Sequence, residues 1–491
     1  MSNPNNNICT EKVGVLVPIS FHLQIRYLIR SGLLETMNEY CNPIVALSWE
    51  QEDIKEELRR LNIDCIYFTD IRKPDLKINN LKTKIDNYFD EKILKTTTHK
   101  IRQIKRYSTF TFKKKIKEIL KRSISNFLFN ESKYEKSIKE YKNLLRTDSN
   151  FELFKSILHD NKISYLLTTA PFMHHEAVAC VAAESLSIDI LYSVISFDNI
   201  TTRGCLPFNF SHFFVWNEIN KKQIQRFYRI DISDRIHVVG PVQFDFYFRE
   251  GFIKRPDQWR RERNLPQNRK IILYGANVKY WFPGEHKIIK IIDQAITAGL
   301  IIGRPIILLR PHPTDSFKDW EEFSKTCMNV YVEKSIVKNE SEDKMYNKYS
   351  NFTLEDVKSL CSSLMNTNIH ISYCSTLSID GICFDKPQIN IYFSPDSCLI
   401  SNHVIRSQYQ SEHFQPVFDS KAIELPKNID ELIISINQSF TNPNWKQNYR
   451  REILNDFVGK GDGLSMIRLS ASIKSILHAK YESLDLYKYN R

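Results

Sequence analysis

A tetrapeptide in the second half of the chain, Arg310-Pro-His-Pro, places a guanidinium and an imidazole close together on stiff backbone. It follows an apolar run at residues 305–309, whose β-branched and leucine side chains predict a buried strand that the prolines end. Arg310 and His312 would then lie at the carboxyl edge of a sheet, which is where open α/β sheets bind ligands. Taken alone, such a tetrapeptide is also typical of a stiff turn.

A second stretch repeats this arrangement further along the chain. Ser375 and Thr376 come directly after a predicted strand at residues 369–374 and, with Ser378 and Asp380, begin a helical pattern. Hydroxyls and the free N–H groups of a helix start attract anions, although Ser or Thr at such a place can also be an ordinary cap. Because both stretches follow strands of one alternating series, we expect them to meet and to hold the phosphates of a nucleotide.

Acid–base candidates stand in two polar loops earlier in the chain. His174 and Glu176 lie where a predicted strand passes into a helix, and Asp198 lies in the next such loop, followed by Asn199 and Arg203. A carboxylate or an imidazole can take the proton of an attacking hydroxyl. Each of these residues can also be a cap or a structural residue, and the sequence does not rank the three candidate bases.

Strand and helix patterns alternate in two series, which assign these residues to two domains. The first series fills residues 1–243, apart from a Lys-rich helical insertion at about 72–160, and the second fills residues 269–491 after a charged linker at 244–268. We predict an α/β protein with two Rossmann-like, doubly wound domains that face a cleft, the first for an acceptor and the second, with C-terminal helices, for a nucleotide donor.

Glycine positions bear on the kind of nucleotide site. Gly275 and Asn277 follow the first strand of the second series and join the predicted donor side. No Gly-x-Gly-x-x-Gly follows the first strand of the chain, so the fingerprint of a dinucleotide-binding domain is missing. This excludes an NAD enzyme.

Composition limits the partners and the compartment. The chain of 491 residues has 69 Lys and Arg against 57 Asp and Glu, and its charge of +12 favours an anionic partner such as a nucleotide, a phosphate-bearing acceptor, a nucleic acid or a membrane surface. Ten cysteines without a Cys-x-x-Cys pair argue against a zinc ribbon and a disulfide framework. Polar residues 1–7 and the lack of an apolar run near the ~20 residues of a membrane span predict a soluble cytosolic protein.

The insertion contains a strongly basic segment. Residues 101–122 hold nine Lys or Arg and one acid, Glu118, with apolar and aromatic residues between them. A basic amphipathic helix of this kind can lie on an anionic lipid surface, at the inner face of the cytoplasmic membrane. The alternative is a solvated helix packed on the first domain.

Several motifs in residues 160–470 resemble a known family. The loop Ser196-Phe-Asp-Asn-Ile-Thr-Thr-Arg-Gly is similar to a Ser-Trp-Asp-Asn-Leu-Thr-x-Lys-Gly loop of GT-B glycosyltransferases of bacterial surface polysaccharide biosynthesis and of their relatives, the CDP-glycerol glycerophosphotransferases. Phe197 here replaces the tryptophan and Arg203 replaces the lysine. The other matching motifs are Phe214-Val-Trp-Asn-Glu, Val239-Gly-Pro-Val-Gln-Phe-Asp, Arg310-Pro-His-Pro and Cys374-Ser-Thr-Leu-Ser.

The resemblance implies a GT-B fold and a donor activated by CMP, CDP or UDP. The Arg-Pro-His-Pro and Ser-Thr motifs also look like those with which CMP-sialic acid transferases hold a nucleotide. We therefore predict a glycosyltransferase that moves a sugar to a surface glycan or a lipid-linked acceptor, with His312 among the catalytic residues. No Asp-x-Asp lies near these motifs to hold Mg²⁺ or Mn²⁺, so we expect no metal and no cofactor besides the donor itself.

Three other functions remain open from the sequence. One is transfer of glycerol phosphate from CDP-glycerol on the same fold, and another is a UDP-sugar 2-epimerase-like isomerase, which would consume its donor without an acceptor. The third is a lipid- or nucleic-acid-binding protein in which the basic segment is the functional part. With a nucleotide site predicted, we do not expect a nucleic-acid partner.

Overall fold

The computed structural model describes residues 12–68, 75–108, 110–228, 233–279, 281–312, 315–334, 353–397, 399–459 and 461–489. The polar residues 1–7, the start of the insertion at 72–74 and Pro313 lie outside the described residues.

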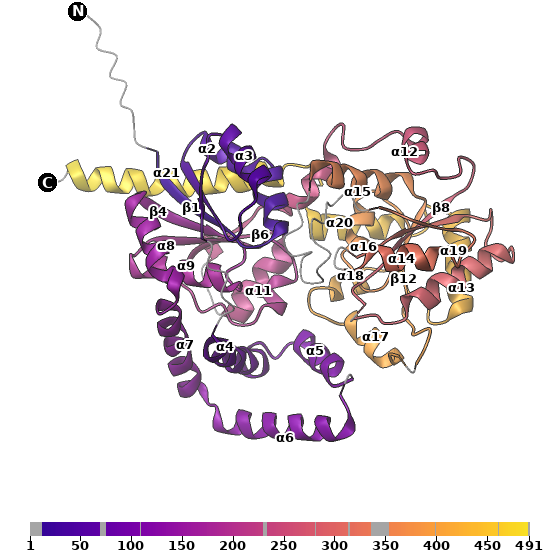
Figure 1. Ribbon diagram of the computed structural model, residues 1–491, viewed down its shortest axis with the longest axis horizontal. Coiled ribbons are helices and arrows are strands. Elements are labelled where there is room, and N and C mark those ends of the chain that lie inside the picture. The colour runs from indigo at the N-terminus through magenta and orange to yellow at the C-terminus, as the bar shows by residue number, and fades with distance from the viewer. Residues whose placement is uncertain are drawn as a thin grey trace, which may run out of the picture.

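A parallel sheet of seven strands forms the N-terminal domain (Figure 1). Its central strands are largely apolar and buried, as expected when helices cover both faces of a parallel sheet. At its centre, Leu16 pairs with Ile44 on one side and with Leu166 on the other. The order across the sheet is β3 (Asp64–Tyr67), β2 (Asn42–Leu47), β1 (Gly14–Ile19), β4 (Ile163–Thr168), β5 (Asp189–Ser193), β6 (Phe210–Val215) and β7 (Ile236–Val238).

The helices of this domain follow the sequence pattern with one interruption. The apolar spacing predicts one helix over residues 22–37, but the chain forms a π-helical turn, η1 (Ile25–Arg30), and then reverses at Gly32. Gly32 has φ of 89°, which a residue with a side chain rarely adopts, so the helix cannot continue through it. The helices are α1 (His22–Gln24), α2 (Leu33–Asn38), α3 (Glu52–Arg60), α9 (His174–Ser185), α10 (Asn199–Thr202) and α11 (Glu218–Tyr228).

The insertion is helical in its described part and extends below the N-terminal sheet in Figure 1. Tyr134, Tyr141 and Leu145 of α7 and Phe154 of α8 are buried in the core of the N-terminal domain, so these two helices hold the insertion to the domain. The elements are α4 (Leu76–Tyr88), a π-helical turn η2 (Phe89–Leu94), α5 (Thr97–Ser108), α6 (Phe112–Leu128), α7 (Glu131–Arg146) and α8 (Ser149–Asp160).

A second parallel sheet, of six strands, forms the C-terminal domain. Both edge strands are missing from the sequence prediction because they are only three and two residues long, too short to show a pattern. The order is β10 (Val330–Val332), β9 (Ile306–Arg310), β8 (Ile271–Gly275), β11 (Ile369–Ser372), β12 (Gln388–Asn390) and β13 (Ile423–Glu424). The helices are α13 (Glu285–Thr297), α14 (Phe317–Ser324), α15 (Leu354–Asn366), α16 (Leu377–Cys383), α17 (Asn402–Gln408), α18 (Gln415–Asp419), α19 (Ile429–Thr441) and α20 (Gln447–Val458).

Residues 244–268 connect the domains as packed structure. They contain most of the 3₁₀ segment η4 (Val242–Phe248) and the helix α12 (Pro256–Glu262). Trp259 of α12 is fully buried and belongs to the C-terminal core. The sequence predicts a linker here because the charged residues conceal the few apolar ones that anchor it.

The last helix, α21 (Ser465–Tyr489), returns to the N-terminal domain. Its Leu469, Ile473 and Leu477 are buried in the same cluster as β1, and Asp245 caps its start by accepting hydrogen bonds from the amides of Ser465 (3.0 Å) and Met466 (2.8 Å). The domain boundary at 269–491 therefore differs from the structure, since α21 needs the N-terminal sheet to cover its apolar stripe.

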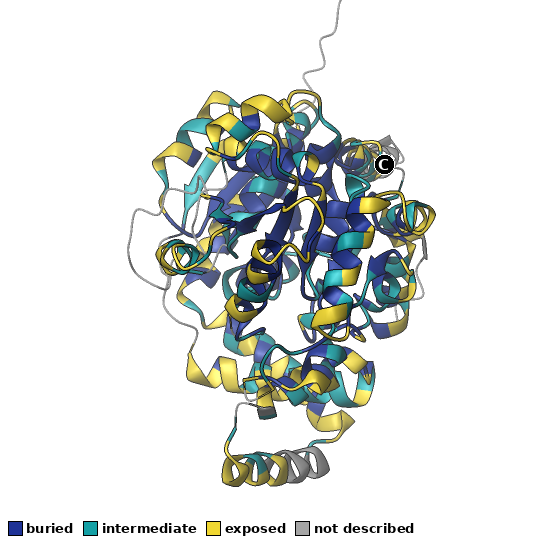
Figure 2. Cartoon of the chain, turned by 90° about the vertical axis from the view of Figure 1, so that its right-hand side faces the viewer, coloured by how far each residue is buried: buried dark blue, intermediate teal, exposed yellow. Residues whose placement is uncertain are grey.

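Figure 2 looks onto the C-terminal domain, whose buried strands lie beneath helices with exposed outer faces. The helix at the lower edge of this view, α6, is exposed over most of its described side chains. The apolar cores stabilise the two domains. The polar loops that follow the strands line the space between the domains.

Candidate functional site

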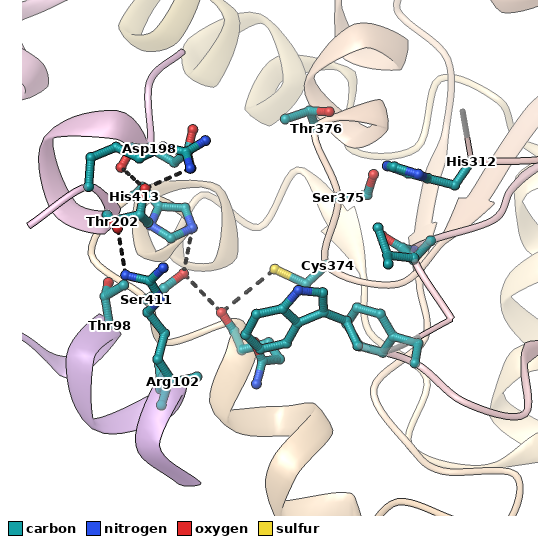
Figure 3. A pocket seen from close by; sticks show the side chains of 17 residues that line it. Thr98, Arg102, Asp198, Thr202, His312, Cys374, Ser375, Thr376, Ser411 and His413 are labelled. Atoms are coloured by element: carbon teal, nitrogen blue, oxygen red, sulfur yellow. Dashed lines mark hydrogen bonds between the residues drawn. The ribbon is translucent and has the colours of Figure 1, made fainter. Parts of the chain in front are cut away.

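A cavity of about 380 Å³ lies between the two domains (Figure 3). Four groups of residues line it: loops that follow strands of the C-terminal sheet, the end of α17 and the segment after it, the loop at α10 of the N-terminal domain, and helix α5 of the insertion. The lining residues are Thr98, Ile101, Arg102, Asp198, Thr202, Arg203, Asn277, Val278, Trp281, Phe282, His312, Cys374, Ser375, Thr376, Gln408, Ser411 and His413.

The C-terminal wall contains four of the predicted donor-side residues. Asn277, His312, Ser375 and Thr376 follow β8, β9 and β11, whose carboxyl ends lie at one edge of the sheet. Burial lowers the pKa of His312, with partial compensation from Asp315, so its imidazole is neutral at pH 7. At neutral pH this wall therefore presents hydroxyls, an amide and a neutral ring.

Gly275 allows this wall to form without lining it. A Cβ atom at this position would lie 2.1 Å from Cδ2 of Leu377, the first residue of α16. The absence of a side chain lets the start of α16 come close to the end of β8. Gly275 thus acts by allowing close packing, and a larger residue would require the side chain of Leu377 to move.

The N-terminal wall is charged. Asp198 accepts hydrogen bonds from the hydroxyls of Ser196 and Thr202, the latter at 3.0 Å. Burial would raise the pKa of Asp198, but the nearby His413 and Arg203, together with these hydrogen bonds, outweigh it and lower that pKa below the ordinary value. Asp198 is therefore ionised at neutral pH, opposite the hydroxyls of the C-terminal wall (Figure 3).

Two further parts of the cavity were not predicted from the sequence. Helix α5 contributes Thr98, Ile101 and Arg102, and the segment after α17 contributes Ser411 and His413. The ring of His413 hydrogen-bonds to the hydroxyls of Thr201 (3.1 Å) and Ser411 (3.2 Å) and packs on Phe197, so it joins the C-terminal domain to the α10 loop. Burial lowers the pKa of His413.

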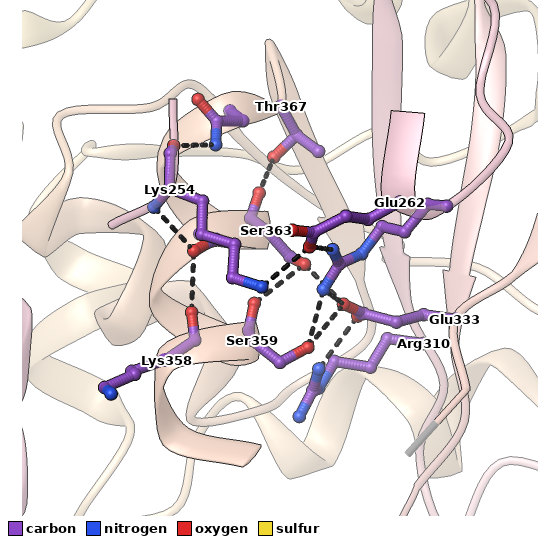
Figure 4. A network of polar contacts seen from close by, with 11 residues as sticks. Lys254, Glu262, Arg310, Glu333, Lys358, Ser359, Ser363 and Thr367 are labelled. Carbon is purple, nitrogen blue, oxygen red and sulfur yellow. Dashed lines mark hydrogen bonds and ion pairs between the residues drawn. The ribbon is translucent and has the colours of Figure 1, made fainter. Parts of the chain in front are cut away.

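Arg310 does not line the cavity. Its guanidinium forms an ion pair with Glu333 at 2.8 Å, and that carboxylate also contacts Arg263, Ser359 and Ser363 (Figure 4). Burial raises the pKa of Glu333, but Arg310 and Arg263 outweigh it, so the net shift is downward and the group is ionised. The structure therefore separates Arg310, in a buried network, from His312, in the cavity.

His174 and Glu176 lie on α9, away from the cavity. Nε2 of His174 is 2.7 Å from Oδ2 of Asp148, the residue that caps α8. Glu176 is fully buried and accepts hydrogen bonds from Thr168 (2.6 Å), the amide of Ala170 (2.9 Å) and Gln24 (2.8 Å). Both side chains hold elements together, and of the three candidate bases the structure brings only Asp198 to the cavity.

The remaining predicted residues lie behind the walls. Ser378 is buried against Asn390, and Asp380 accepts a hydrogen bond from Tyr247 (2.8 Å) while burial raises its pKa to about 6. Asn199 is buried, and neither polar atom of its amide has a hydrogen-bond partner among the residues that the structure describes. None of the three belongs to the cavity lining.

One carboxyl group stands directly behind the C-terminal wall. Glu285, the first residue of α13, accepts a hydrogen bond from the amide of Asn277 at 2.9 Å. Burial raises the pKa of Glu285 to about 8, so this group is largely protonated at neutral pH. Among the described residues there is no group of three or more His, Cys, Asp and Glu side chains placed to hold a metal ion.

The fold and the cavity together define the class of the protein: two Rossmann-like domains of the GT-B kind with a polar site between them. No family model and no curated protein sequence matches the chain. Among solved structures, it is similar to MnaA of Staphylococcus aureus in complex with UDP (TM-score 0.51, 10% identity, 95% of this chain and 97% of that one). It is also similar to the UDP-GlcNAc 2-epimerase of Neisseria meningitidis bound to UDP-GlcNAc (TM-score 0.51, 14% identity, 94% and 99%).

A glycosyltransferase from Rickettsia africae is similar with a TM-score of 0.49 and 11% identity, over 95% of this chain and 98% of that one. At these identities the likeness to the first two structures shows the fold alone. It confirms the prediction of a GT-B-like, two-domain α/β architecture with a helical insertion in the first domain.

Proposed function

We propose that the protein is a glycosyltransferase that uses a nucleotide-activated sugar. The observation that carries the proposal is the pairing across one cavity of an ionised carboxylate, Asp198, with the hydroxyls of Ser375 and Thr376 and the imidazole of His312. Departure of a nucleotide from a sugar develops negative charge on its phosphate, and fixed hydrogen-bond donors stabilise that charge. Asp198, on the opposite wall, would accept the proton of the attacking hydroxyl.

The proposed reaction assigns a role to each wall. The C-terminal wall would bind the nucleotide, and the N-terminal wall would bind the acceptor hydroxyl. We propose that Arg310 does not contact the donor, because it pairs with Glu333 and does not line the cavity. We propose that these protein groups and the nucleotide donor suffice, without a metal ion.

The test is a two-stage assay. Thermal shift with UDP, CDP, CMP and their sugar conjugates finds the nucleotide, since a ligand that binds the folded state raises Tm. The bound conjugate is then incubated with and without a mixture of glycan and lipid-linked acceptors. Release of the nucleotide that depends on an acceptor supports a transferase. Binding of none of these nucleotides would contradict the proposal, and binding of CDP-glycerol alone would favour glycerol phosphate transfer.

A second candidate function is 2-epimerisation of a UDP-sugar, because two of the structurally similar proteins are described as complexes with UDP or UDP-GlcNAc and one of them is a UDP-GlcNAc 2-epimerase. Epimerisation at C2 removes the hydrogen of that carbon and returns one from solvent. Conversion of UDP-GlcNAc without an acceptor, with uptake of deuterium at C2 in heavy water, would select the epimerase.

We also propose that the enzyme works at the inner face of the cytoplasmic membrane and that α6 contacts the lipid. Phe112, Ile116, Ile119 and Leu120 are 44–77% exposed and fall on one side of this helix, next to exposed Lys113, Lys114 and Lys117. Apolar side chains flanked by lysines match an anionic lipid surface. No helix in the described part of the chain is long and apolar enough to cross a bilayer.

Vesicle sedimentation tests this contact. Binding to vesicles with anionic lipid should exceed binding to neutral ones, fall as salt rises, and decrease in Ile116→Asp. The control is Leu300→Asp, which places the same charge at an exposed leucine of the C-terminal domain. Equal losses in both variants, or equal binding to neutral vesicles, would rule out docking through α6.

A further inference from the structure

Helix α5 is fixed to both domains, although it belongs to the insertion in the first. At its start, the carboxylate of Glu412 accepts hydrogen bonds from the amides of Thr97 and Thr98, the latter at 2.7 Å, and from the hydroxyl of Thr98. Further along, the ammonium of Lys105 donates to the carbonyl of Trp281 at 3.1 Å. These contacts attach α5 to the C-terminal domain at two places that lie about two helical turns apart.

The contact with the N-terminal domain is made by Arg102. Its guanidinium donates to the carbonyl of Thr202 at the end of α10, at 2.5 Å. Thr98 and Ile101 are buried between these attachments. Since α5 is held to both domains, it forms part of the wall of the site (Figure 3).

The charges in the cavity are distributed unevenly. Arg102 and Arg203 both line it, and neither forms an ion pair with a carboxylate within the described ranges. Arg203 lies over the ring of Phe172 at 4.5 Å, a contact that leaves the edge of its guanidinium able to donate. The one carboxylate in the lining, Asp198, already accepts two hydroxyl hydrogen bonds, and Glu412 is used by the start of α5.

Each arginine has N–H groups beyond those already used, since a guanidinium carries five and pairs with phosphate or carboxylate through two of them at once. Two such groups come from separate elements, α5 and the α10 loop, and both line the cavity together with Asp198. The C-terminal wall, with its hydroxyls, lies on the other side (Figure 3). The cavity thus contains two cationic side chains that are not part of the wall proposed for the nucleotide.

We propose that the acceptor carries an anionic group, a phosphate or a carboxylate, and that Arg102 of the insertion and Arg203 of the α10 loop bind it beside Asp198. This inference rests on the proposed function, which defines the donor and the acceptor. It assigns a role to the insertion: α5 supplies one of the two cations that select the acceptor.

Binding measurements on the full chain saturated with UDP test this inference. The probes are glucose 1-phosphate, glucuronate and the neutral methyl glucoside, and the first two distinguish a phosphate from a carboxylate. We expect an anionic probe to bind at least about tenfold more tightly than methyl glucoside. Arg102→Gln and Arg203→Gln should each weaken that probe about tenfold or more, as expected for the loss of a hydrogen bond to a charged group, while UDP affinity stays within twofold.

Controls separate this binding from general electrostatics and from misfolding. Lys100→Gln removes a charge from the same helix on a side that does not line the cavity and should change nothing. Arg102→Lys keeps the charge and should retain part of the binding, and an unchanged Tm shows that α5 is still in place.

Three results would overturn the inference. The first two are binding of methyl glucoside as tight as that of the anionic probe, and a loss of probe binding in Lys100→Gln as large as that in Arg102→Gln. The third is a loss of UDP affinity in Arg102→Gln, which would indicate that this arginine binds the donor. If no nucleotide binds but Arg102→Gln still abolishes binding of glucose 1-phosphate, the proposed function fails and the anion site stands.

Discussion

The two walls of the cavity differ in charge although both are largely buried. On the N-terminal wall, Asp198 is ionised because His413, Arg203 and two hydroxyls outweigh the cost of burial. Behind the C-terminal wall, Glu285 has no cation among the main causes of its shift, and burial raises its pKa to about 8. The comparison teaches that the partners decide which carboxyl can act as a base, since burial acts on both in the same direction.

The largest expected effect comes from removing the negative charge of Asp198 from the N-terminal wall. Asp198→Asn keeps the shape but cannot accept a proton, so we expect kcat to fall by about 10²–10⁴ while the affinity for the nucleotide is unchanged. Steady-state kinetics and nucleotide titration measure the two quantities. Asp234→Asn, on the exposed surface, is the matched control. Normal turnover with weakened acceptor binding would reduce Asp198 to a positioning residue.

The second-largest expected effect tests whether Arg310, behind the C-terminal wall, stabilises the fold and does not bind the ligand. Arg310→Met leaves Glu333 buried with Arg263 as its remaining cation, and we expect the free energy of unfolding to fall by about 3 kcal/mol. Denaturant unfolding measures it, with Arg255→Met at an exposed site as the control. A variant of normal stability that has lost nucleotide binding would return Arg310 to the donor site.

Glu285 makes stability depend on pH. Its pKa in the folded protein is raised above that of the unfolded chain, so its contribution is present at low pH and is lost as pH rises towards about 8. We expect Glu285→Gln to gain up to about 2 kcal/mol relative to the wild type between pH 6 and pH 8, from a slope of at most about 1.4 kcal/mol per pH unit. Unfolding at several pH values measures this, and Glu322→Gln should show no such gain. A constant difference across this range would mean that Glu285 is ionised throughout.

The smallest effect concerns the neutral donor groups. His312→Ala should weaken nucleotide binding about tenfold, the loss of one hydrogen bond, without lowering Tm. His403→Ala, at an exposed site of the same domain, is the control. If His312→Ala were as destabilising as Arg310→Met, the distinction between a binding residue and a structural one at this strand end would be lost.

The sequence predicts the C-terminal wall better than the N-terminal one, for a physical reason. His312, Ser375, Thr376 and Asn277 each follow a strand of one parallel sheet, so local patterns suffice to bring them to one edge. Arg310 has the same signal, and only its pairing with Glu333, which directly follows the neighbouring strand β10, takes it out of the site.

The N-terminal wall depends on contacts between distant parts of the chain. Thr98 meets Glu412 across 314 residues, and Thr201 meets His413 across 212. No local pattern encodes such a pair, and the helical sequence of α5 is compatible with a solvated helix. The same limit applies to His174 and Glu176, whose partners Asp148 and Gln24 are visible only once the elements are packed.

The return of α21 to the N-terminal domain affects the order in which the protein can fold during synthesis. The sheet of that domain is complete once residue 238 has been made, but the cluster that Leu469, Ile473 and Leu477 complete stays uncovered until nearly the whole chain has left the ribosome. The C-terminal sheet and the helices up to α20 are made in the meantime. The domain that begins first is therefore finished last, and a nascent chain carries an open apolar surface throughout the synthesis of the second domain.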